Sequence, residues 1–149
     1  MITKILKKMF LFVTVSCFSF NLHAADWTMA SGYPKSNFHT QNIIKFIDDV
    51  KSTTSVNINL NPNDTLIKLD AIKTSLQRGQ IPIGEIRLGI YGNEDPMYIL
   101  AGLPFIAPDY SSAWMLKDVQ MEYLQEKFYK KGLMILYTAP WPGQGFYTK

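Results

Sequence analysis

The side chain with the clearest chemical potential is Glu85, which lies in the stretch Ile83-Gly84-Glu85-Ile86-Arg87. A carboxylate inside an apolar strand is costly unless it is exposed, paired or part of a site. Arg87 stands two positions further on, so both side chains fall on one face of a strand and would form an outward pair there. The pattern slightly favours this surface pair, and a role in a binding site is the alternative.

Catalytic motifs are absent from the sequence, which has no G-x-S-x-G, H-E-x-x-H or G-x-x-x-x-G-K element. A zinc site needs about three protein ligands, and His39 is the only histidine after residue 25. A lone histidine of this kind is expected on a helix surface. A hydrolase that uses Glu85 with Asp64 or Asp109 is an open alternative, although no paired acidic motif is visible. We expect a protein that is not an enzyme and that needs no cofactor or metal.

Two aromatic residues near the end of the chain, Trp141 and Phe146, flank the turn Gly143-Gln144-Gly145. Large aromatic side chains build cores, and they also wall ligand pockets, where they supply apolar area and a stacking face. A core role is the default interpretation for both residues, and a pocket wall is the alternative.

Alternating strands and helices are expected to position these side chains. Residue spacing predicts strands at 26–33, 56–60, 81–88 and 133–137, with helices at about 36–53, 66–78 and 111–131. This order predicts an α/β domain with a largely parallel sheet. Ligands of such sheets bind at the carboxyl ends of the strands.

The helix boundaries have their own signals. Ser36 and Ser111 are the expected N-terminal caps, and Gly79 and Gly132 the expected C-terminal ones. The inward face of the last helix is expected to carry Leu116, Val119, Tyr123 and Phe128.

Residues 1–24 have the features of a secretory signal peptide: three lysines in the first eight positions, an apolar run at 9–20, and small residues at Ala24-Ala25. The remaining chain has 12 basic and 12 acidic residues, which argues against a nucleic-acid surface. Cys17, the only cysteine, lies in the signal, so no disulfide is expected.

Several segments stand in the order and spacing of a known family. They are Ala30-Ser31-Gly32-Tyr33-Pro34, Asn61-Pro62-Asn63, Gln77-Arg78-Gly79-Gln80-Ile81-Pro82-Ile83-Gly84-Glu85, Leu103-Pro104-Phe105, and the stretch 132–148. Together they resemble the DctP-type solute-binding proteins of TRAP (tripartite ATP-independent periplasmic) transporters. The resemblance covers nearly all of the chain after the signal.

The resemblance implies a periplasmic binding protein-like fold with two α/β lobes that close on a ligand. Residues 25–149 would be the N-terminal first lobe, truncated and therefore incomplete. Family members also carry a ligand-pairing arginine in a G-x-K-x-R segment, which would follow Lys149. We therefore expect this chain alone to bind weakly or not at all.

The resemblance further implies that the protein captures a small organic acid-like solute, most simply a carboxylate, in the periplasm. TRAP membrane subunits would be its partners, and no nucleic acid is expected. The residues expected to bind the ligand are Ser31, Tyr33, Glu85, Trp141 and Phe146. A secreted standalone interaction domain is the alternative from a different class.

Overall fold

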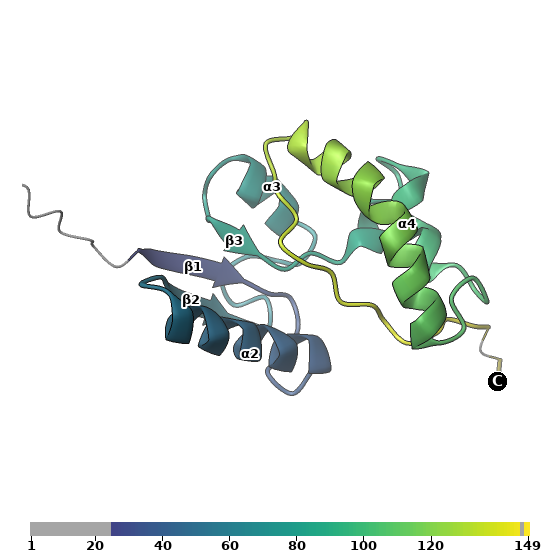
Figure 1. Cartoon of the computed structure of the whole chain (residues 1–149), viewed down its shortest axis with the longest axis horizontal. Coiled ribbons are helices and arrows are strands. Elements are labelled where there is room, and N and C mark those ends of the chain that lie inside the picture. The colour runs from purple at the N-terminus through teal and green to yellow at the C-terminus, as the bar shows by residue number, and fades with distance from the viewer. Residues whose placement is uncertain (1–24, 147) are drawn as a thin grey trace, which may run out of the picture.

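The structure is a computed structural model that describes residues 25–146 and 148–149, so the predicted signal segment lies outside it. Strands and helices alternate along the chain before a long helix (Figure 1). The elements are β1 (Asp26–Ala30), α2 (Phe38–Thr53), β2 (Asn57–Asn61), α3 (Ile72–Gln77), β3 (Ile83–Gly84), the 3-10 helices η1 (Leu88–Tyr91) and η2 (Pro96–Gly102), and α4 (Tyr110–Tyr129). The expected α/β class is confirmed.

The three strands form one parallel sheet in the order β2, β1, β3. Met29 of β1 is aligned with Leu60 of β2 and with Ile83 of β3. Parallel neighbours need crossover connections, which α2 and α3 provide. The carboxyl ends of all three strands consequently meet at the same edge of the sheet.

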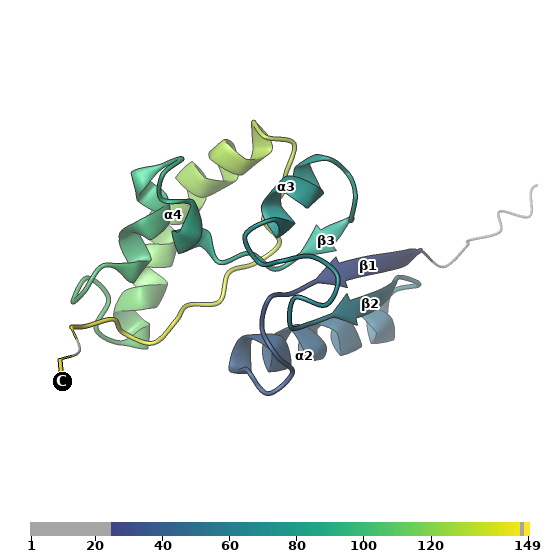
Figure 2. The same ribbon diagram turned by 180° about the vertical axis from the view of Figure 1, so that it is seen from behind.

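The sheet is covered by helices on both faces, with α2 on one side and α3 on the other (Figures 1 and 2). Successive residues of a strand point to opposite faces. Met29 therefore packs with Ile43 of α2, while Ala30 packs with Ile72 of α3. No helix in the described part of the chain is long and apolar enough to cross a membrane.

Helix α4 packs beside the sheet on the two 3-10 helices. Its core contacts come from Leu124 and Phe128, which meet Tyr91 and Tyr98. The prediction that Val119 faces inward is wrong, because this side chain is 80% exposed. The neighbouring Gln120 is buried instead, and its amide donates a hydrogen bond to the Met97 carbonyl (3.0 Å).

Helix α3 is shorter than predicted, and its first residue is Ile72 instead of a residue near Leu66. The Asp64 carboxylate accepts a hydrogen bond from the Leu69 N–H (2.9 Å) and holds the preceding segment in turns. The predicted end is correct, since Gly79 follows the helix with a left-handed φ of 67°.

Strand β3 is also shorter than predicted. The Glu85 N–H still donates to the Ala30 carbonyl (2.9 Å), but the chain then leaves the sheet and forms η1.

The predicted strand at 133–137 is wrong, since this segment lies outside the described sheet and passes between β3 and α4 (Figure 1). Its side chains nevertheless alternate. Leu133 and Ile135 pack on the α4 cluster, whereas Met134 and Leu136 are exposed. The alternation that suggested a strand therefore comes from packing on one side of an extended segment.

The two predicted N-terminal caps are each displaced. Asn37 caps α2 instead of Ser36, and Asp109 caps α4 instead of Ser111. In each case a side-chain oxygen accepts a hydrogen bond from a first-turn N–H, at 2.8 and 2.7 Å. Asn and Asp bind these free N–H groups at least as well as serine does.

Replacing Asn37 by alanine should lower the free energy of unfolding by about 1 kcal/mol. The substitution removes the acceptor of the His39 N–H at the start of α2. Urea denaturation measures the change, and Ser36→Ala is the matched control that should leave the midpoint in place. Equal losses in both variants would contradict the assignment of the cap.

Candidate functional site

The carboxyl ends of β1 and β3 bring two of the predicted binding residues together. Ala30 is aligned with Gly84 in the sheet, so the residues that follow them, Ser31 and Glu85, are neighbours. Ser31 is fully buried, and its hydroxyl donates a hydrogen bond to the Glu85 carboxylate. The Ser31 Oγ also lies 3.4 Å from the Tyr33 N–H, which donates to it.

Glu85 is thus held in a partly buried polar position. Burial raises the pKa of its carboxyl, and the hydrogen bond from Ser31 offsets part of this rise. The outward pair with Arg87 is not formed, since no ion pair joins these two residues in the described structure. Arg87 is exposed, and Glu85 uses the hydroxyl of Ser31 instead.

The acidic partners considered for a hydrolase are engaged elsewhere. The Asp64 carboxylate accepts from a turn N–H, and the Asp109 carboxylate caps α4. Within residues 25–146 and 148–149, no three His, Cys, Asp or Glu side chains gather as a metal site would require. The arrangement around Glu85 is suited to accepting and donating hydrogen bonds.

An aromatic cluster adjoins this polar pair. The Tyr33 ring lies 5.5 Å from Trp141 in an edge-on arrangement, and Trp141 lies 4.4 Å from His39. Phe38 completes the cluster, 4.1 Å from His39 and 5.4 Å from Trp141. Burial raises the pKa of Tyr33, while the charge of Arg87 lowers it.

The expectation of a surface position for His39 is wrong. The side chain is 5% exposed, and burial lowers its pKa. Sequence spacing placed His39 on α2 but gave no sign of Trp141, which covers the histidine from a segment about a hundred residues away. The contact of Phe38 with Trp141 depends on the same segment.

Phe146 is not brought to this site. Its side chain is 78% exposed, and its ring lies 5.7 Å from Phe105. The surrounding turn is anchored by a hydrogen bond from the Phe105 N–H to the Gln144 carbonyl (3.0 Å). Of the five residues predicted to bind ligand, the structure therefore gathers four and leaves Phe146 apart.

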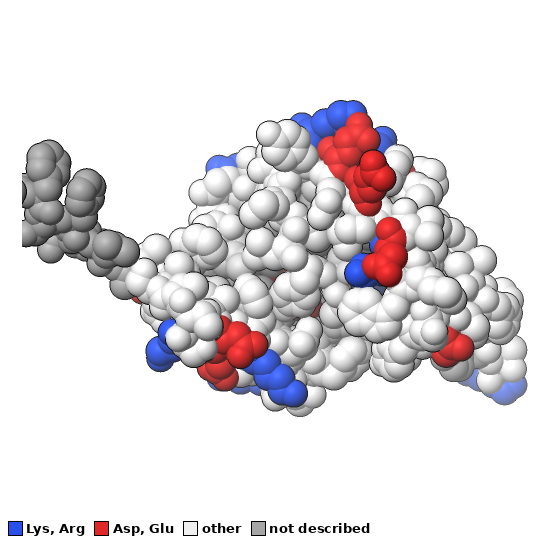
Figure 3. Space-filling model, in the orientation of Figure 1, with Lys and Arg blue, Asp and Glu red and all other residues white. Residues whose placement is uncertain are grey.

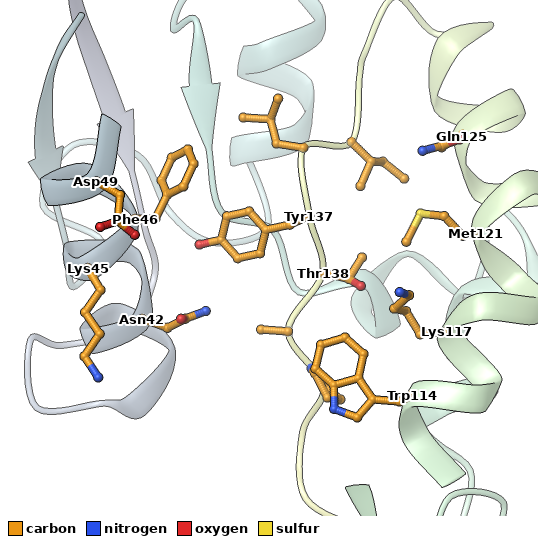
Figure 4. Close-up of a pocket in the computed structure, with 14 residues that line it drawn as sticks. Asn42, Lys45, Phe46, Asp49, Trp114, Lys117, Met121, Gln125, Tyr137 and Thr138 are labelled. Carbon is orange, nitrogen blue, oxygen red and sulfur yellow. The ribbon is translucent and has the colours of Figure 1, made fainter. Parts of the chain in front are cut away.

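A pocket of about 740 Å³ opens beside the site, between α2, α4 and the extended segment at 135–140 (Figure 4). None of the five predicted residues lines it. Tyr137, which was expected in a strand, connects the two regions: its ring lies 5.3 Å from Phe46 in the pocket wall. Burial and the nearby charge of Glu85 both raise the pKa of Tyr137.

Charged side chains lie mainly toward the margins of the face shown in Figure 3, and the middle of this face is largely uncharged. The pocket itself has a mixed lining, with Lys45 and Asp49 from α2, and Trp114 and Lys117 from α4. In Figure 4 these side chains stand on the two sides of the extended segment that carries Tyr137.

Three solved structures resemble this chain closely. DctP6 of Bordetella pertussis, an extracytoplasmic solute receptor binding pyroglutamic acid, is 39% identical with a TM-score of 0.76 over 79% of this chain and 40% of its own. DctP7 of the same organism, described in the same words, is 33% identical with a TM-score of 0.75 over 80% and 40%. A TRAP solute-binding protein specific for pyroglutamate, from an unidentified marine microbe, is 32% identical with a TM-score of 0.77 over 82% and 41%.

The chain thus spans about 40% of the length of these structures. No protein-family model matches the sequence, and no curated protein does. The similarity to these three structures therefore rests on the shared fold and on sequence identity over about a third or more of the aligned residues.

Proposed function

Because this chain belongs to the DctP-type solute-binding proteins of TRAP transporters, we propose that it is part of a periplasmic receptor for a small organic acid. The receptor would deliver its ligand to TRAP membrane subunits for transport. The three similar proteins are described as solute receptors or solute-binding proteins, which fits a binding role rather than a catalytic one.

The observation that carries this proposal is the polar pair of Ser31 and Glu85 at the carboxyl ends of β1 and β3. Open α/β sheets bind their ligands at this edge. A carboxylate in a partly buried position is a strong hydrogen-bond acceptor for an N–H group. We therefore propose a ligand that combines an acid group with an N–H, as pyroglutamate does.

Tyr33 and Trp141 would form the aromatic side of the same site, next to Glu85. An aromatic face supplies apolar contact to a small ring, and the polar groups fix the orientation of that ring. In a two-lobed receptor the ligand must contact the closed state better than the open one. A single lobe offers only part of these contacts, so we expect a weak affinity, on the order of millimolar, for residues 25–149 alone.

Pyroglutamate should bind this chain through the Glu85 carboxylate. In an NMR titration of the isotope-labelled chain, pyroglutamate should shift the resonances of Ser31, Tyr33 and Glu85. Glu85→Gln should weaken binding about tenfold, because a charge-assisted hydrogen bond becomes a neutral one. In the lactone analogue a ring oxygen replaces the N–H. This analogue should bind the wild-type chain about as weakly as pyroglutamate binds Glu85→Gln.

Glu122→Gln is the matched control, because Glu122 is an exposed carboxylate on α4. This variant should bind pyroglutamate as the wild type does. Shifts that spread along α4, or an equal response to the lactone and to pyroglutamate, would contradict a site at Glu85.

A further inference from the structure

Three buried side-chain atoms in the described part of the chain have no hydrogen-bond partner: Tyr33 Oη, His39 Nε2 and Thr138 Oγ1. Two of them belong to the aromatic cluster beside Glu85. The Tyr33 and His39 rings are 6.0 Å apart, and the indole of Trp141 packs against both. A buried polar group without a partner is costly, so two such groups in one cluster indicate a missing polar partner.

The start of α2 holds the backbone of both residues in place. The Asn37 side chain accepts a hydrogen bond from the His39 N–H (2.8 Å). The Thr40 hydroxyl donates to the Tyr33 carbonyl (3.3 Å) and ties the first turn of the helix to the loop after β1. His39 is also 95% buried, given its exposed fraction of 5%. The backbone of both residues is thus fixed by local structure, and the imidazole of His39 is buried.

Their position relative to Glu85 suggests what the partner is. Glu85 lies near enough to Tyr33 for its charge to act on the phenol. The Ser31 hydroxyl that bonds Glu85 also accepts from the Tyr33 N–H. The Tyr33 ring lies 6.0 Å from the His39 ring. Burial lowers the pKa of His39, which keeps its imidazole neutral near pH 7. A neutral imidazole and a phenol each offer one N–H or O–H donor without a positive charge. Such donors suit a neutral carbonyl oxygen, whereas a carboxylate is better matched by arginine.

We propose that Tyr33 Oη and His39 Nε2 donate hydrogen bonds to a ring carbonyl of the ligand while Glu85 accepts from the adjacent N–H. The preferred ligand class would then be small cyclic amides that carry an acid group. This inference rests on the proposed function and adds two specificity-determining residues to it. The Trp141 indole packs against both rings, so it must move to admit the ligand. It lies in a segment without regular secondary structure.

The test compares two ligands on three variants of the chain. Pyroglutamate has the ring carbonyl and N–H, and cyclopentanecarboxylate has the same ring size and acid but neither group. Tyr33→Phe removes only the hydroxyl and keeps the ring that contacts Trp141. His39→Asn removes the Nε2 position, whereas His39→Gln places an amide donor near it. In weak binding the initial slope of the NMR shift against ligand concentration reports relative affinity.

Tyr33→Phe and His39→Asn should each lower the affinity for pyroglutamate about tenfold. Both should leave the affinity for cyclopentanecarboxylate unchanged, and His39→Gln should restore part of the loss. Pyroglutamate should also shift the imidazole nitrogen resonances of the wild type, which needs no variant to fold. If a buried water is the only partner of Tyr33 Oη and His39 Nε2, each substitution should change the affinity for both ligands equally. That result would overturn the inference.

The two proposals fail in different ways. If pyroglutamate shifts no resonance of the wild-type chain at a concentration that would reveal millimolar affinity, the proposed site at Glu85 fails and this inference fails with it. If pyroglutamate binds and responds to Glu85→Gln, but Tyr33→Phe and His39→Asn bind it as the wild type does, only the carbonyl contact is overturned.

Discussion

Replacing Glu94 by glutamine is expected to destabilise the fold by about 3 kcal/mol. Glu94 forms ion pairs with Lys73 of α3 and with Lys131 after α4 (2.6 Å for the second pair). The Lys73 side chain is only 4% exposed, and its ammonium lies 4.1 Å from the centre of the Tyr91 ring. Removing the carboxylate leaves this ammonium buried without its counter-charge, and the ring alone offsets only part of that cost.

Lys73→Met is the informative partner of this variant. It removes the buried charge itself and fills the space with an apolar side chain, which is often neutral for a buried pair. Glu94 keeps Lys131 as a partner in that variant. Chemical denaturation should therefore show a much larger loss for Glu94→Gln than for Lys73→Met. The reverse order would mean that Lys73 stabilises the fold mainly by its packing.

Acid unfolding gives an independent check on the same carboxylate. Hydrogen bonds from Lys131 and then Lys73 lower the pKa of Glu94 in the folded chain. A lowered carboxyl pKa contributes stability that is complete above the pKa of the unfolded chain and is lost as the pH falls through the folded value. The wild type should lose stability in this acidic range, and Glu94→Gln should show a smaller loss there.

Three of the four predicted strands are present in the sheet, because their signals are local. Alternation of strands and helices identifies the parallel α/β class. The family resemblance, and not the spacing, indicates Ser31 and Glu85 as binding residues, and the structure places both at the same edge of the sheet. The sequence does not decide between Arg87 and Ser31 as the partner of Glu85. A spacing of two predicts which side chains share a strand face, whereas the choice of partner depends on a neighbouring strand more than fifty residues away.

The less accurate predictions concern residues whose environment comes from distant segments. His39 was expected on a helix surface, and it is buried among aromatic rings that include Trp141 of a distant segment. The segment at 133–137 alternates like a strand because one of its sides packs on α4. Whether such a segment forms a strand depends on a hydrogen-bonding partner, which no period in its own sequence reveals.

Gly84→Ala is expected to cost about 2 kcal/mol of stability and to separate Glu85 from Ser31. A Cβ at position 84 would lie 2.7 Å from Cγ2 of Ile72, which is fully buried. Because Gly84 precedes Glu85 and is aligned with Ala30, relief of this clash must move β3 away from α3 or from β1. Gly89→Ala is the matched control, since its added Cβ meets nothing within 4 Å.

A double-mutant cycle with Ile72→Ala separates this clash from a general intolerance of side chains in β3. Ile72→Ala alone should cost about 3 kcal/mol through the cavity that it leaves. In the Gly84→Ala background the new methyl occupies part of that cavity and no longer meets Cγ2, so the combined loss should be smaller than the sum of the two. The loss of pyroglutamate affinity in the double variant should likewise be smaller than the sum of the two single losses. The reason is that the close approach of Gly84 to Ile72 sets the position of Glu85 relative to Ser31. If the losses in the free energy of unfolding are strictly additive, the effect of Gly84→Ala does not come from contact with Ile72.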